Sequence, residues 1–215
     1  MRIVLLTGNA SNQAALAVKV AAEFELAGIV IEKRAGKGKK RNLQKYVEAI
    51  LDRTLFKKLR DSWFHMLGYY SSNYNFPLVN ICEVNSINSK TTLDFLQKIQ
   101  PDIVMVSGTG MIKKEILNLN VPKGILNLHT GLSPYIKGGP NCTNWCLATN
   151  QFHLIGNTVM FIDAGIDSGD LILTETTPLT GDESMDELHL KVMEHAHELY
   201  IKALHNVSSG NYVRI

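Results

Sequence analysis

The sequence has little of what would place it in a specialised class of protein. Its three cysteines in 215 residues are too few for the disulfide framework of a small secreted protein and fit a reducing compartment. No run reaches the roughly 18 consecutive apolar residues of a membrane-spanning helix. The net charge of +2 does not by itself indicate nucleic-acid binding. These absences predict a cytoplasmic globular protein with no membrane and no nucleic acid among its partners.

What is present is typical of one globular domain. Hydrophobic residues make up 45% of the chain and charged residues 20%, and the length is sufficient for a sizeable core. The first apolar run, residues 2–7, has one basic residue and predicts a buried strand rather than a signal peptide. We therefore expect residues 1–215 to form a single domain.

Apolar periodicity predicts an α/β fold. Strand 2–7, helix 12–25 and strand 26–32 form a β-α-β unit, which indicates a parallel sheet with a right-handed crossover. The prediction is a Rossmann-like, doubly wound and mostly parallel sheet with an antiparallel edge region near the end of the chain. Further strands are expected at 78–82, 102–107, 124–129, 154–162 and 171–177, and further helices at 89–100, 113–117, 141–149 and 183–207.

Residues 33–76 form a predicted helical insertion after the second strand. Six of the nine residues 33–41 are basic, and an apolar stripe from Leu43 to Leu55 predicts a helix behind them. The polar and aromatic stretch 65–75 is expected to be loop. Such a basic run can neutralise a diphosphate, or it can simply be a solvated loop.

Three polar side chains follow apolar runs in the second half of the chain. Asn127 and His129 are two residues apart and therefore share one face of the expected strand, Pro134 follows five residues after the histidine, and Asp167 opens an Asp-Ser-Gly turn. A lone histidine and a turn aspartate have an ordinary structural interpretation. Together, an amide, an imidazole and a carboxylate at strand ends favour a site that polarises a carbonyl and moves protons.

This combination resembles the formyltransferase family that uses 10-formyltetrahydrofolate, whose motif is Asn-x-His, a proline-containing loop and an Asp in a glycine turn. The resemblance covers about residues 1–32 and 78–207. It implies that Asn127 hydrogen-bonds the formyl oxygen, that His129 stabilises the oxyanion and relays a proton, and that Asp167 holds a water or the imidazole. Gly131 stands where many members have serine, so a hydroxyl near the histidine is either missing or supplied by Ser133.

The same resemblance implies where the folate co-substrate binds. Residues 101–112 match the family segment whose backbone lines the pteridine pocket. The implied pocket residues are Gly110, Met111 and Ile112 on one wall and Ile162, Asp163, Ala164 and Gly165 on the other. No metal is expected: Cys142 and Cys146 lack a familiar zinc spacing, and the histidines at positions 189, 195 and 197 are expected at the surface of the last helix.

The residues that would bind the formyl acceptor are less clearly indicated by the sequence. The segment from Gly8 to Asn12 resembles the phosphate loop of glycinamide ribonucleotide transformylase, with Ala10 in place of the middle glycine. A plain capped turn explains it equally well. The candidate acceptor-binding residues are Asn9, Ser11, Asn12, Lys33 and Arg34.

We do not expect the tRNA-gripping C-terminal domain that methionyl-tRNA formyltransferases carry. A compact core with such an insertion resembles N-formyltransferases that act on nucleoside-diphosphate amino sugars for surface polysaccharides such as the O-antigen of lipopolysaccharide. The alternative is glycinamide ribonucleotide transformylase. A remote alternative is a dinucleotide-binding oxidoreductase or noncatalytic nucleotide-binding module, in which Glu32 would bind ribose, although the glycine fingerprint is incomplete. The oligomeric state stays open, a homodimer included.

Overall fold

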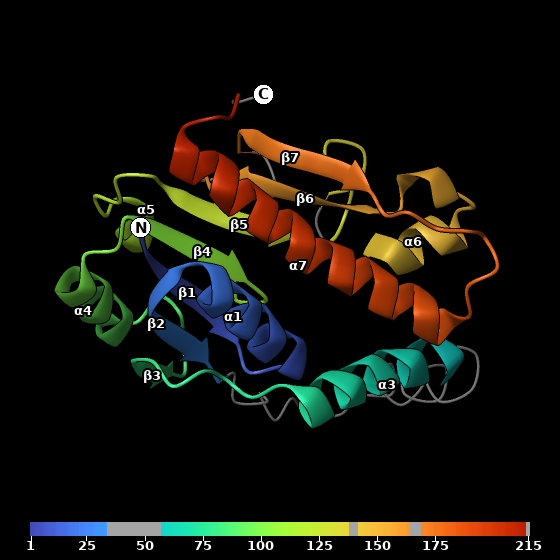
Figure 1. Ribbon diagram of the computed structural model, residues 1–215, viewed down its shortest axis with the longest axis horizontal. Coiled ribbons are helices and arrows are strands. Elements are labelled where there is room, and N and C mark those ends of the chain that lie inside the picture. The colour runs from blue at the N-terminus through green and yellow to red at the C-terminus, as the bar shows by residue number, and fades with distance from the viewer. Residues whose placement is uncertain (34–56, 138–141, 164–168, 214–215) are drawn as a thin grey trace, which may run out of the picture.

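The computed structural model describes residues 1–33, 57–137, 142–163 and 169–213. They contain a seven-stranded sheet in the order β3-β2-β1-β4-β5-β6-β7 (Figure 1). Strands β1 to β5 are parallel, β6 is antiparallel to β5, and β7 is antiparallel to β6. The strands are β1 (Arg2–Gly8), β2 (Glu25–Glu32), β3 (Ile81–Val84), β4 (Ile103–Ser107), β5 (Ile125–His129), β6 (Gly156–Phe161) and β7 (Leu171–Thr176). The predicted fold class, a Rossmann-like sheet with an antiparallel edge, is confirmed.

Helices cover both faces of this sheet. Helices α1 and α7 pack on one face, where Figure 1 shows them lying across the strands, and α4 and α5 pack on the other. Helix α3 packs against the outer sides of α1 and α7. The helices are α1 (Ser11–Glu23), α3 (Lys57–Asn73), α4 (Lys90–Ile99), α5 (Lys114–Leu117), α6 (Cys142–Ala148) and α7 (Met185–Ser209), with a 3₁₀ turn η1 (Phe152–Leu154).

Helix α3 corrects one prediction. Residues 65–75 were expected to be loop, but the helix runs to Asn73. Its buried residues Ser62, Met66 and Tyr70 recur every fourth position and so form one face, which packs against α1 and α7. The exposed aromatic residues Phe64 and Tyr69 obscure this stripe in the sequence. The helix expected around residues 43–55 lies outside the described residues.

The histidines of α7 correct a second prediction. His189 is 5% exposed and His197 is fully buried, whereas both were expected at the surface, as was the largely buried His195. Besides the sheet, α1 and α3 also pack against α7, so positions next to its sheet-facing apolar stripe are buried too. The His189 ring lies between the Ser62 hydroxyl (2.6 Å) and the Asn144 amide oxygen (3.0 Å).

A single hydroxyl on α7 connects two central strands. The Tyr200 side chain is fully buried, and its oxygen accepts a hydrogen bond from the Val106 N–H of β4 at 2.9 Å. The same hydroxyl donates to the Leu126 carbonyl of β5 at 2.8 Å. Burial raises the pKa of this phenol, so the group stays protonated and able to donate. The contact fixes β4 and β5 one residue before Ser107 and Asn127.

We predict that Tyr200→Phe lowers the free energy of unfolding by about 1–3 kcal/mol, because it leaves a buried N–H and a buried carbonyl without a partner. Urea denaturation measures the change. The control is Tyr69→Phe, whose side chain is exposed and whose effect should stay within about 0.5 kcal/mol. Equal effects of the two substitutions would show that the Tyr200 hydroxyl does not hold the strands.

His197 predicts an acid-sensitive stability. Burial lowers its pKa to about 3, with the Lys19 charge adding to the shift and Glu194 opposing it. Glu194 itself accepts hydrogen bonds from Tyr70 and Lys19 at 2.6 Å each. Since the unfolded chain binds a proton near pH 6.5 and the folded chain does not, the contribution of His197 is complete above that pH and is lost as pH falls toward about 3.

The expected loss is ~1.4 kcal/mol per pH unit below the unfolded pKa, or ~2 kcal/mol between about pH 7.5 and about pH 5. His197→Leu should remove this part of the pH dependence, whatever its effect on stability at neutral pH. Urea titrations of both proteins at the two pH values measure the difference. Parallel pH profiles would contradict a neutral buried imidazole at this position.

Candidate functional site

The site is built on the face of β5 that points away from α7. Leu126 and Leu128 belong to the core on the α7 side, so alternation along the strand places Asn127 and His129 on the opposite face. His129 is 8% exposed, and Asn127 is half-buried. The structure thus brings the amide and the imidazole together on one sheet face, as the sequence predicted.

The loop after His129 folds over this face and contacts the ring. His129 Nε2 lies 2.9 Å from the Ile136 carbonyl oxygen. Because a carbonyl can only accept, Nε2 carries a hydrogen in this arrangement. The ring is therefore oriented by the main chain of its own loop.

A threonine of β6 holds the same loop in place. Thr158 is the register partner of His129, and its hydroxyl accepts from the Ser133 N–H at 2.9 Å and donates to the Gly131 carbonyl at 2.8 Å. The Thr174 hydroxyl of β7 lies 2.9 Å from it. Thr158 was not selected from the sequence, although its place opposite His129 in an antiparallel pair is the signal that could have identified it.

The glycine at position 131 is explained by the lack of space for a side chain there. A Cβ built at this residue would lie 2.4 Å from His129 Nε2 and 3.0 Å from Cys142 Sγ. The sulfur itself lies 3.8 Å from that ring nitrogen. The Ser133 hydroxyl, expected as a substitute for the missing serine, is buried and has no hydrogen-bond partner among the described residues. A thiol, rather than a hydroxyl, therefore neighbours the imidazole.

The two walls expected for the folate pocket meet in one apolar cluster. Ile112 is 7% exposed and packs with Ile125, and the partly buried Ile162 packs against the same cluster. Met111 is 64% exposed, and Gly110 is half-buried. The segment 110–112 and the end of β6 therefore lie over the same sheet face as Asn127.

Backbone hydrogen bonds close the connection between β6 and β7, the segment in which Asp167 occurs. The Ile162 N–H donates to the Ile125 carbonyl and the Phe161 N–H donates to the Asp170 carbonyl, both at 2.9 Å. A Cβ at Gly169 would lie 1.9 Å from the Phe161 carbonyl oxygen, so this close approach requires glycine. Asp163 is exposed. Ala164, Gly165 and Asp167 lie outside the described residues, and their assignment stays a prediction.

The expected acceptor residues have different surroundings. The Ser11 hydroxyl donates to the Leu67 carbonyl of α3 at 2.7 Å, and the buried Asn12 amide donates to Met193 Sδ at 3.4 Å. Asn9 is exposed. Lys33 forms an exposed ion pair with Glu83 at 2.6 Å. Arg34 lies outside the described residues.

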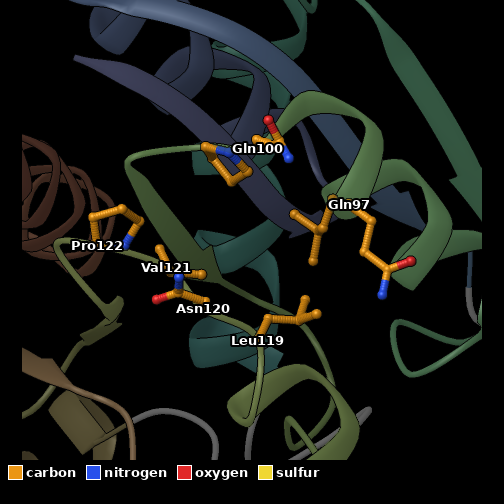
Figure 2. Close-up of a pocket in the computed structure, with 8 residues that line it drawn as sticks. Gln97, Gln100, Leu119, Asn120, Val121 and Pro122 are labelled. Carbon is orange, nitrogen blue, oxygen red and sulfur yellow. The ribbon is translucent and has the colours of Figure 1, made fainter.

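A cleft lies away from all of these predicted site residues. It has a volume of about 430 Å³ and lies between the end of α4 and the segment before β5, and Gln97, Gln100 and Asn120 are among the residues that line it (Figure 2). These segments precede β4 and β5, so the cleft lies at the amino ends of the parallel strands. Among the described residues no cluster of His, Cys, Asp or Glu is suited to a metal ion. No helix in the described part of the chain is long and apolar enough to cross a membrane.

Comparison with known proteins agrees with this geometry. Residues 1–204 match the family described as Formyl transferase. The methionyl-tRNA formyltransferase of Clostridium tetani is 35% identical over 122 residues, which is 56% of this chain and 38% of that protein, and the one from Clostridium beijerinckii is 32% identical over 128 residues, 59% and 40%. The chain spans about two fifths of the length of the curated relatives that it matches.

Solved structures share the fold at low sequence identity. Phosphoribosylglycinamide formyltransferase from Bacillus halodurans has a TM-score of 0.62 at 18% identity, covering 96% of this chain and 95% of that one. A 4-N formyltransferase from Francisella tularensis has a TM-score of 0.58 at 18% identity, covering 100% and 72%.

The family model matches residues 1–204, which is nearly the whole length, and this chain therefore belongs to the formyl transferase family.

We predict that Gly131→Ser lowers the free energy of unfolding by about 1–3 kcal/mol, because the added atoms displace the His129 ring and the Cys142 thiol. Cys142→Ala makes room for the serine, so the double variant should recover part of the loss. A double-mutant cycle by urea denaturation measures this coupling. Strict additivity of the two substitutions would contradict the proposed contact among the three side chains.

Proposed function

We propose that this protein transfers a formyl group from 10-formyltetrahydrofolate to the amine of a nucleotide-linked amino sugar. The observation that carries the proposal is the pairing of Asn127 and His129 on one face of β5, beside the cluster formed by Ile112 and Ile162. Family membership supplies the chemistry, and the paired side chains supply the groups that it needs.

In the proposed mechanism the acceptor amine attacks the formyl carbon. A new C–N bond forms, the carbonyl electron pair moves to oxygen, and the C–N10 bond of the folate then breaks. The amine loses a proton and N10 gains one, so the reaction needs neither a covalent enzyme intermediate nor an oxidant. Asn127 donates to the formyl oxygen, and His129 stabilises the oxyanion and relays the proton. Asp167 holds a water or the imidazole and sets its charge.

The start of α1 favours a sugar nucleotide over glycinamide ribonucleotide. The segment that resembles the phosphate loop of the purine enzyme is in contact with α3, since the Ser11 hydroxyl donates to Leu67 and the Asn12 side chain is buried. These contacts leave less of the loop for a monophosphate. The basic run from Lys33 onward is then the better match for a diphosphate, because an exposed pair such as Lys33–Glu83 is worth little and is readily exchanged.

A second candidate acceptor is an aminoacylated tRNA. It is favoured by the 35% identity to methionyl-tRNA formyltransferase over 122 residues. The chain spans only 38% of that relative, so the similarity supports the shared part alone and not the acceptor.

The experiment compares three acceptors at matched concentration with 10-formyltetrahydrofolate, reading tetrahydrofolate release. We expect a nucleoside-diphosphate 4-amino-4,6-dideoxy sugar to exceed glycinamide ribonucleotide and methionyl-tRNA by about tenfold or more in kcat/KM. Its KM should rise with salt, because exposed charges are screened over about 8–10 Å. If only glycinamide ribonucleotide or only methionyl-tRNA is formylated efficiently, that acceptor replaces the proposed sugar nucleotide. If tetrahydrofolate is released with none of the three acceptors, the proposed function is rejected.

His129→Ala is the catalytic control in the same assay. Its turnover should fall roughly a hundred- to thousandfold while folate binding persists, because one stabilising group of the oxyanion is lost. His153→Ala is the matched variant, since this exposed histidine lies on η1. Wild-type turnover in His129→Ala would remove the imidazole from the mechanism.

A further inference from the structure

Two side chains from neighbouring strand ends hold the main chain of the 110–113 segment. Glu32, the last residue of β2, accepts the Gly110 N–H at 2.8 Å with Oε2 and the Ile87 N–H at 2.9 Å with Oε1. Asn88 donates from Nδ2 to the Met111 carbonyl at 2.9 Å and accepts the Lys113 N–H at 2.8 Å. One carboxylate and one carboxamide thus hold the main chain at Gly110, Met111 and Lys113.

The Glu32 carboxylate is well suited to this task. It is 6% exposed, and a buried carboxylate is costly unless it accepts hydrogen bonds. Its two backbone bonds are charge-assisted, which makes them stronger than neutral ones. Because Ile87 and Asn88 are adjacent, Glu32 also fixes the loop that carries Asn88. The Glu32 and Asn88 side chains are thus two linked clamps on the 110–113 backbone, and they act as one unit.

The clamps leave a definite set of backbone groups for a ligand. They engage the Gly110 N–H, the Met111 carbonyl and the Lys113 N–H. Among the hydrogen bonds of the described residues, none uses the N–H of Met111 or the N–H and carbonyl of Ile112. These remaining groups have the donor and acceptor character that a pteridine edge requires.

We propose that Glu32 and Asn88 are positioning residues that pre-organise the 110–112 backbone for the pteridine ring of the folate. This inference rests on the proposed function. A loop held in its binding geometry before the ligand arrives avoids the entropic cost of ordering it on binding. The carboxylate of Glu32 serves the loop backbone, which is a different role from the ribose ligand of a dinucleotide-binding protein.

Two substitutions test the clamp. Glu32→Gln replaces one accepting oxygen by an NH₂ group, so one backbone N–H loses its partner, and Asn88→Ala removes both bonds of the second clamp. The matched controls are Glu115→Gln on α5 and Asn120→Ala in the segment before β5, whose side chains are exposed. Calorimetric titration with 5-formyltetrahydrofolate gives Kd, and steady-state kinetics give kcat and both KM values.

We expect each clamp variant to raise the folate Kd and KM about tenfold, the effect of losing one good hydrogen bond. The acceptor KM should stay within about twofold, and the control variants should match the wild type. Amide hydrogen exchange of the ligand-free proteins should become faster at Gly110 in Glu32→Gln and at Lys113 in Asn88→Ala. These exchange data detect the loosened loop even if a variant is less stable overall.

The possible failures are distinguishable. If the wild type binds folate and both clamp variants bind it equally well, the positioning role is wrong while the proposed function stands. If the clamp variants only melt earlier, with unchanged Kd and loop exchange, the residues are structural and the inference is overturned. If the wild type binds no folate, the proposed function fails and the inference fails with it.

Discussion

The hydroxyl of Tyr200 is the contact on which the geometry of the site depends. It inserts from α7 between β4 and β5 and bonds the main chain of both. The next residues are Ser107, which leads into the 108–113 segment, and Asn127, the first polar residue of the site. The relative position of the 108–113 segment and of the strand that carries Asn127 and His129 is therefore set from the opposite face of the sheet by a residue of α7.

The loops around the site are shaped by space and by backbone contacts more than by side-chain chemistry. Gly169 and Gly131 occur where an additional carbon would collide with the Phe161 carbonyl or with the His129 ring. The Thr158 side chain holds the loop after His129, and the Glu32 side chain holds the 110–113 segment. Both act through hydrogen bonds to main-chain groups of those loops. At these four positions the residue type is therefore set by the close approach or the fixing of main chain.

Much of the fold could be predicted from the sequence, because buried parallel strands are continuous apolar runs with clear turns. The pairing of Asn127 with His129 followed from alternation alone. Helix α3 could not be predicted, since its short buried face is recognisable only once α1 and α7 are known to cover it. The burial of His197 was missed for the same reason: this position is covered by α1 and α3, and its burial is recognisable only once their packing against α7 is known. The contact between Cys142 and Gly131 joins residues from separate elements, and no local pattern encodes it.

Helix α3 is attached to the core by polar contacts at its inner face, from Ser11 to the Leu67 carbonyl and from Tyr70 to Glu194. The contact with Ser11 uses only the main chain of α3, so it does not depend on which side chain stands at position 67. The outer face of the helix does not contact the sheet. The outer face of α3 can therefore change in sequence without disturbing the strand that carries Asn127 and His129. The described part of the connection between β2 and β3 is thus coupled to the sheet only through the helices that lie between them.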